Sequence, residues 1–184
     1  MSVTPDKISL LILGSGEVAR LLVALARHAA YTIIVCDDHS DQHHWPEGVE
    51  LRSYNFSTQP WSLAAHTHAI IARGHQGDAE NLISLLQHRA EHVYLIASAT
   101  RAQGIIDQVT PLLSDPSMLA QISAPAGLNL GGQTSYAIAL SILSEIQWRS
   151  NDPQAIQTLT ELRTERLNNS VTDQRNKPCP GKRP

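Results

Sequence analysis

Residues 8–19, ISLLILGSGEVA, join a short apolar run to a glycine-rich turn and to the start of a helical pattern. This order of strand, glycine turn and helix is typical of the first unit of a Rossmann fold. In such a unit Gly14 permits the tight turn, Gly16 lets the backbone approach a phosphate, and Ala19 keeps the helix close to the sheet. The stretch therefore predicts that a nucleotide or a similar anion binds at residues 14–18.

A second strand-like run, Tyr31–Cys36, ends in two acids, Asp37 and Asp38. Asp37 follows Gly14 by 23 positions, close to the gap of about 20 residues at which a carboxylate meets a ribose hydroxyl in this fold. No arginine follows the acids at once, so the sequence disfavours a 2′-phosphate on that ribose. The alternative is that the glycine turn serves packing alone and that the domain binds nothing there.

Strand-like and helix-like patterns alternate along the chain, which predicts an α/β fold: a Rossmann-like, doubly wound parallel sheet with an additional C-terminal helix. Residues 39–60 are expected to be mostly loop, with room for a short strand at 50–54. Asp78 is expected to cap the helix that follows it. The other expected strands are 8–13, 31–36, 69–72 and 93–97, and the expected helices are 17–28, 61–65, 79–89, 100–113 and 134–147.

The chain is expected to contain a Rossmann-like domain over residues 1–150, a C-terminal helix over 151–169 and a disordered tail over 170–184. Asp152-Pro153 is typical of a helix start. The helix could pack on its own domain or against a second subunit, so we expect a homodimer. Its imperfect apolar stripe consists of Ile156, Leu159, Leu162 and Leu167.

Bulk properties exclude several classes of protein. The 184 residues are 42% hydrophobic and 17% charged, and no apolar run approaches the length of a membrane span. Met1–Lys7 lacks the regions of a signal peptide, so a cytoplasmic protein is expected. The net charge of −3 argues against nucleic acid as a partner. Only two cysteines occur, Cys36 and Cys179, which excludes a disulfide framework and a Cys-x-x-Cys metal site.

Ala124–Gly132 is a second glycine-rich stretch, and it leads into the helix expected at 134–147. Backbone amides before a helix N-terminus can face an anion. Loops that leave the carboxyl ends of parallel strands surround a common crevice, so we expect the two glycine loops to frame one ligand. The candidate ligand-binding residues are Gly14, Ser15, Gly16, Glu17, Val18, Asp37, Asp38, His75, Gly127, Asn129 and Gly131.

Glu17 tests the prediction that an anion binds at the first turn. A helix N-terminus favours an anion by about 0.3 to 1 kcal/mol, whereas two unit charges 4 Å apart repel by about 4 kcal/mol at an effective dielectric of 20. We therefore expect that the carboxylate turns away, that a cation intervenes, or that the ligand is not a pyrophosphate.

Other polar residues give weaker signals. His75 and Asp78 could form a polar pair on the ligand side of the sheet. The acids and histidines of residues 37–44 have no metal-ligand spacing, so we expect a hydrated loop and no metal site. No nucleophile with an adjacent base is visible, and catalytic residues therefore remain unknown.

Four stretches together resemble the C-terminal Rossmann domain of the xanthine dehydrogenase accessory family, XdhC/CoxI. They are residues 11–19, 35–38, 74–78, and 125–131 with 137–146, and the resemblance covers about residues 8–148. It implies an accessory role in maturing molybdenum hydroxylases, in which relatives bind molybdenum cofactor and help to deliver its sulfurated form.

The chain departs from that family at several positions. Glu17 stands where the family commonly has His, and Asn129 stands where it has Asp. Residues 97–101, Ala-Ser-Ala-Thr-Arg, replace a Gly-Ser pair followed by basic residues, which should weaken anion binding there. Only seven residues precede the first expected strand, where relatives usually have a separate domain with a cysteine tied to the accessory role.

We therefore expect a non-catalytic accessory protein that binds molybdenum cofactor or a dinucleotide such as NAD and serves a molybdenum hydroxylase such as xanthine dehydrogenase. One alternative is a small NAD-dependent oxidoreductase, for which His75 is the sole candidate proton donor. Another is a nucleotide-sensing regulatory domain, because residues 77–81 resemble the ligand-binding domains of potassium-uptake systems.

Overall fold

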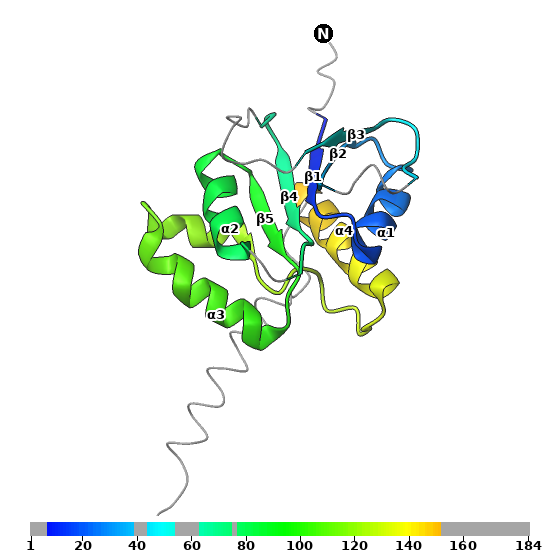
Figure 1. Ribbon diagram of the computed structural model, residues 1–184. Coiled ribbons are helices and arrows are strands. Elements are labelled where there is room, and N and C mark those ends of the chain that lie inside the picture. The colour runs from blue at the N-terminus through cyan, green and yellow to red at the C-terminus, as the bar shows by residue number, and fades with distance from the viewer. Residues whose placement is uncertain (1–6, 39–43, 54–62, 75–76, 152–184) are drawn as a thin grey trace, which may run out of the picture.

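Within the residues that the structure describes, six strands form one parallel sheet, in the order β3-β2-β1-β4-β5-β6, at the centre of the fold (Figure 1). The computed structural model describes residues 7–38, 44–53, 63–74 and 77–151. This strand order is that of the dinucleotide-binding doubly wound fold, as the alternating pattern predicts. The strands are β1 Ser9–Leu13, β2 Thr32–Cys36, β3 Val49–Arg52, β4 Thr67–Ile71, β5 His92–Leu95 and β6 Ile122–Ser123, and the helices are α1 Glu17–Ala26, α2 Asp78–Gln87, α3 Ala99–Val109 and α4 Ser135–Asn151.

The side chains of β1 alternate between two apolar layers. Leu11 and Leu13 pack in the layer formed with α2 and α3, and Leu10 and Ile12 pack in the layer formed with α1 and α4. Every residue of β1 is buried. A central parallel strand covered on both faces needs apolar residues at every position, which explains why this strand reads as a continuous apolar run.

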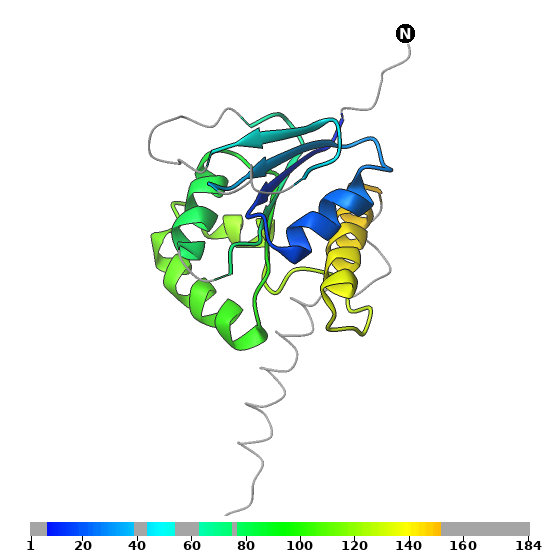
Figure 2. The same ribbon diagram turned by 45° about the vertical axis from the view of Figure 1, so that its right-hand side comes forward.

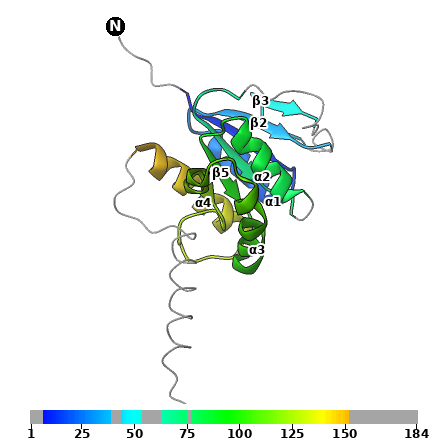
Figure 3. The same ribbon diagram turned by 90° about the vertical axis from the view of Figure 1, so that its left-hand side faces the viewer.

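The chain changes faces of the sheet between β1 and β4. Helix α1, which follows β1, lies beside α4 on one face (Figure 2), whereas α2, which follows β4, packs with α3 on the other face (Figure 3). Doubly wound sheets bind their ligands outside the carboxyl ends of the strands at such a switch point. The loops that leave β1, β2, β4, β5 and β6 therefore share the edge where a ligand is expected.

Most expected elements are confirmed, with shifted ends. The short strand expected near 50–54 is β3. The helix expected at 100–113 ends at Val109 and continues as a 3₁₀ helix, Thr110–Leu112, because Pro111 cannot donate a helical hydrogen bond. Residues 63–65 of the helix expected at 61–65 are not helical, and its remainder lies outside the described residues.

Two features of the sheet and its helices differ from expectation. Strand β6 was not expected, since its two residues are too short to show a periodicity. Asp78 does not cap α2: Gly77 occupies the cap position, and Asp78 lies buried in the first turn. Its carboxylate instead pairs with the guanidinium of Arg101 at the start of α3. Of the helix and tail expected over residues 151–184, the structure describes residue 151 alone, and residues 152–184 lie outside the described range.

Among the described residues, no helix is both long enough and apolar enough to cross a membrane.

Candidate functional site

The first glycine turn combines a tightly packed glycine with an open one. Gly14 has a φ of +114°, and a Cβ there would lie 2.8 Å from the carbonyl oxygen of Ala72, which follows β4. Gly16 is the cap of α1 with a φ of −65°, and a Cβ there would meet nothing within 4 Å. Gly14 is therefore required by the fold, whereas Gly16 leaves space beside the N-terminus of α1.

Ser15 connects this turn to the acid at the end of β2. Its hydroxyl donates a hydrogen bond of 3.1 Å to Oδ2 of Asp37. Ser15 is buried, Asp37 is half-buried and Asp38 is exposed. The pair places one candidate ribose acceptor directly beside the turn.

An arginine lies next to Asp37 in space although none follows it in sequence. Arg52 ends β3 opposite Cys36, and its carbonyl oxygen accepts a hydrogen bond of 3.2 Å from the backbone N–H of Asp37. The guanidinium of Arg52 donates to Glu50 at 2.7 Å. The sequence has no arginine directly after the two acids, but strand pairing brings the backbone of Arg52 in β3 alongside Asp37 after β2.

The late glycine loop is hydrogen-bonded to a buried carboxylate of α4. The backbone N–H of Gly127 donates to Oε2 of Glu145 at 2.7 Å. Gly127 has a φ of +107°, and a Cβ there would overlap the hydroxyl of Ser141. The expectation that the Gly127 amide faces a ligand is therefore wrong, because Glu145 already accepts its hydrogen.

The remainder of the late loop borders a cavity of about 320 Å³. Gly131 has a φ of +72°, and a Cβ there would meet nothing within 4 Å. Asn129 is exposed. The cavity lies between this loop, the N-terminal part of α4 and the end of β5, and the residues that line it are 96–97, 125–126, 128–133, 137–138 and 141.

A side-chain hydrogen bond joins the two glycine loops. The hydroxyl of Ser135, the first residue of α4, donates to Oε2 of Glu17 at 2.7 Å. The Glu17 side chain therefore turns toward the N-terminus of α4, where two helix N-termini lie side by side. Together with the bond between Ser15 and Asp37, this contact brings the first turn, the β2 acid and the late loop to one edge of the sheet.

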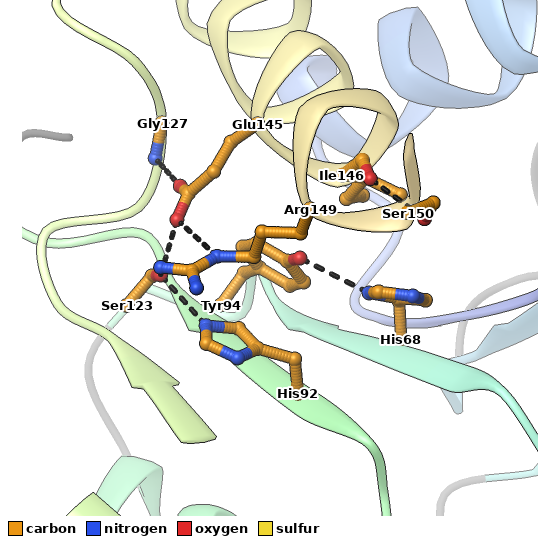
Figure 4. A network of polar contacts seen from close by, with 9 residues as sticks. All are labelled: His68, His92, Tyr94, Ser123, Gly127, Glu145, Ile146, Arg149 and Ser150. Carbon is orange, nitrogen blue, oxygen red and sulfur yellow. Dashed lines mark hydrogen bonds and ion pairs between the residues drawn. The ribbon is translucent and has the colours of Figure 1, made fainter. Parts of the chain in front are cut away.

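A buried polar network lies behind the late loop (Figure 4). Its centre is Glu145 of α4, which is fully buried and accepts from the hydroxyl of Ser123 in β6. Arg149, one turn later, donates to Glu145 at 2.9 Å and to the Ser123 oxygen at 3.3 Å. His92 of β5 contacts the same oxygen through Nε2 at 2.8 Å. The network ties β5, β6, α4 and the late loop together.

This network contains a serine, a histidine and an acid but is not arranged for nucleophilic catalysis. Because the Ser123 hydroxyl donates to Glu145, its oxygen accepts from His92, so the imidazole acts as a donor and not as a base. Burial lowers the pKa of His92 from 6.5 to about 2, with Arg149 acting in the same direction. Ser123 is fully buried. The group therefore has a structural role.

A second buried histidine supports the same face of the sheet. His68 of β4 lies 3.0 Å from the hydroxyl of Tyr94 in β5 (Figure 4), and burial lowers its pKa. Sequence reasoning missed both histidines and Glu145. The signal for Glu145 was its position three residues after the buried Ile142, on the apolar side of α4.

The remaining candidates are placed as follows. Val18 is half-buried in the first turn of α1 and contributes to the apolar layer under that helix. Cys36 is buried, and burial raises the pKa of its thiol to about 12. His75 lies outside the described residues, as do residues 39–43 of the polar cluster. Among the described residues, no three His, Cys, Asp or Glu side chains gather as a metal site would require.

Comparison with known proteins now defines the family. The model of the XdhC Rossmann domain matches residues 10–146. The chain belongs to this family. The match spans most of β1 through most of α4, so both glycine loops and Glu145 lie within the matched residues.

Two individual proteins are similar to this chain. The chain is 26% identical over 151 residues to the uncharacterized protein YqeB of Escherichia coli strain K12, covering 78% of this chain and 28% of that protein. A crystal structure named as a xanthine dehydrogenase from Bacillus halodurans superposes with a TM-score of 0.66 at 22% identity, covering 85% of this chain and 46% of that one. At this identity the structural likeness shows the fold alone, and the chain spans less than half the length of either relative.

Proposed function

We propose that this domain is the ligand-binding part of an XdhC-like accessory protein that binds molybdenum cofactor and presents it to a molybdenum hydroxylase of the xanthine dehydrogenase class. The observation that carries the proposal is the convergence of the first glycine turn, Asp37 and the start of α4 at one edge of the sheet, next to the late loop and the cavity that it borders. Membership of the XdhC family supports the accessory role.

The open glycines fit the organic part of that cofactor. A phosphate would approach the backbone near Gly16 and Gly131, where a Cβ would meet nothing within 4 Å. The carboxylate of Asp37 would accept a hydrogen bond from a ring N–H or a ribose hydroxyl. The cavity of about 320 Å³ is at the small end of ligand sites, which span about 300 to 1,000 Å³.

These residues would hold the cofactor by its phosphate and ring, and the bound group would supply the molybdenum that the hydroxylase uses. The described residues offer no cluster of metal-ligating side chains. The proposal therefore assigns recognition to backbone amides and one carboxylate. It assigns the chain binding and transfer, and no bond-breaking step.

The test is equilibrium titration of the protein with isolated molybdenum cofactor, and separately with NAD, NADH and AMP. Asp37→Ala should weaken binding of the preferred ligand by about ten- to a hundredfold, because a hydrogen bond to a charged group contributes about 1.5 to 3 kcal/mol. Asp107→Ala is the matched control, since Asp107 is an exposed acid of α3 that contacts Gln103. This control should bind like the parent protein.

The pattern of ligands separates the candidate functions. Binding of molybdenum cofactor, followed by activation of a cofactor-free hydroxylase, would support the accessory role. Tight binding of NAD with turnover would favour the oxidoreductase alternative, and nucleotide binding without turnover would favour a sensor. If none of these ligands binds, the convergence of the two loops serves packing alone and the proposal fails.

A further inference from the structure

An apolar groove runs along one flank of α4, next to the side that packs on the sheet. Its α4 wall is formed by residues at three- and four-residue spacing, among them Leu140, Leu143 and Trp148, and the late loop adds Leu128 and Leu130. The groove encloses about 650 Å³. Leu130 is 52% exposed and Leu140 is 37% exposed. An apolar surface of this kind on a helix flank is typical of an unfilled packing site.

The chain itself continues from the end of this groove. Helix α4 ends at Asn151, three residues after Trp148, and the next residues are Asp152 and Pro153. An Asp-Pro pair ends one helix and starts another, because proline cannot continue a helix but suits its first turn. The described part of the chain therefore ends next to the α4 wall of the groove.

The sequence after Pro153 has an apolar face of matching size. At 100° per residue, Ala155, Ile156, Leu159 and Leu162 fall within about 120° of a helix surface, and the polar residues Gln157 and Glu161 fall opposite. The stripe ends at Arg163. From Ile156 to Leu162 a helix rises about 9 Å, and from Leu140 to Trp148 it rises about 12 Å. Two antiparallel helices joined by a short link would align these stretches.

We propose that residues 153–162 form a helix that folds back and packs its apolar face into the groove of α4. A segment tethered by a few residues has an effective local concentration in the millimolar range, which favours it over a second copy of the chain at ordinary protein concentrations. Leu128 and Leu130 line both this groove and the ligand cavity. The segment therefore packs against the loop that borders the proposed ligand.

Disulfide trapping in the full chain tests the contact. Ser144→Cys, on the groove side of α4, and Leu159→Cys are combined in a Cys179→Ser background, which leaves the buried Cys36 as the sole other thiol. Mild oxidation should give a monomer of increased mobility on a non-reducing gel. The matched control combines Leu159→Cys with Leu112→Cys in place of Ser144→Cys. Leu112 is 60% exposed and follows α3 on the opposite face of the sheet. This control pair should stay reduced.

The outcomes are decisive. A disulfide-linked dimer would overturn the proposal by assigning the groove to a second copy, and free thiols in both pairs would overturn it outright.

A second measurement does not depend on cysteine geometry. Trp148 lines the groove. When Trp45 and Trp61 are replaced by Phe, the fluorescence of Trp148 therefore reports whether residues 153–162 cover the groove. Leu159→Asp should shift its emission to longer wavelength and raise quenching by acrylamide at least twofold, whereas Gln157→Asp, on the opposite side of the segment, should leave both unchanged. Equal spectra for the two variants would overturn the proposal.

Discussion

The two glycine loops of this domain look alike in sequence, and each contains a glycine that the fold requires, but the late loop also depends on a buried charge. Gly14 fits against Ala72 and Gly127 against Ser141, where no side chain has room. In the late loop, Glu145 also accepts the N–H of Gly127 and is itself paired with Arg149. Similar glycine-rich loops can therefore share a steric requirement and still differ in the electrostatic contacts that hold them.

The difference also separates supporting glycines from accessible ones. Gly14 and Gly127 hold the loops on the sheet, whereas Gly16 and Gly131 adjoin open space. We expect the second pair, and not the first, to meet a ligand. Four changes test this division, and they are given from the largest expected effect to the smallest.

Removing the Glu145 carboxylate, which accepts a hydrogen bond from the late loop, should lower the free energy of unfolding the most. Glu145→Ala leaves Arg149 without its partner and leaves the Gly127 N–H and the Ser123 hydroxyl without an acceptor. We expect the free energy of unfolding to fall by about 3 kcal/mol, measured by urea denaturation. Glu145→Gln keeps an acceptor and should cost less. A loss below about 0.5 kcal/mol for Glu145→Ala would show that the late loop does not depend on this carboxylate.

Replacing Gly14 and Gly16 by serine, one at a time, should distinguish the glycine that the fold requires from the glycine that a ligand approaches. Gly14→Ser introduces a Cβ at a φ of +114° beside the Ala72 carbonyl and should destabilise the protein by about 2 kcal/mol. Gly16→Ser occupies the cap position of α1 with an ordinary φ, where serine is a good cap. It should leave the melting temperature unchanged but weaken ligand binding. Equal melting temperatures for the two variants would contradict the division.

Acid should weaken the network that supports the late loop. The pKa of His92 is lowered by burial from 6.5 to about 2, so between these values the unfolded chain binds more protons than the folded one. The free energy of unfolding should therefore fall as the pH drops below about 6.5, by up to about 1.4 kcal/mol per pH unit for this one group. His68, whose pKa is lowered in the same direction, adds to the effect.

The variant that checks this pH dependence is His92→Gln, which keeps a donor for Ser123 but does not titrate. Urea unfolding at several values between pH 4.5 and 7 should give a shallower slope than the parent protein. His28→Gln, at an exposed histidine after α1, serves as the control and should leave the slope unchanged. An identical slope in all three proteins would contradict a role for His92.

The smallest effect is expected at the contact between the loops. Glu17 places a negative charge beside the N-terminus of α4, where an anionic ligand would otherwise gain about 0.3 to 1 kcal/mol. Glu17→Gln should therefore raise the affinity for a phosphate-bearing ligand by up to about fivefold, measured by calorimetry. Glu80→Gln, at an exposed acid in the first turn of α2, is the control. Unchanged affinity in Glu17→Gln would place the anion elsewhere.

Periodicity and glycine spacing predicted the fold well because they reflect local rules. The apolar run at β1, the helical stripe of α1 and the acid after β2 all follow from neighbours in sequence. The same rules failed for β6, which has two residues and exists only because β5 offers it a partner. They also failed for Asp78, since a capping role and an ion pair to Arg101 are indistinguishable until α2 and α3 are packed together.

The sequence by itself determined the order of strands and helices, the buried faces and the family, because each depends on residues close together in the chain. Only the tertiary structure decided which polar groups face one another. The Arg52 backbone lies beside Asp37, Glu17 meets Ser135 across 118 positions, and Glu145 occupies the amide of Gly127. A buried polar group must find a partner wherever packing brings one, and that choice is made only once the helices lie on the sheet.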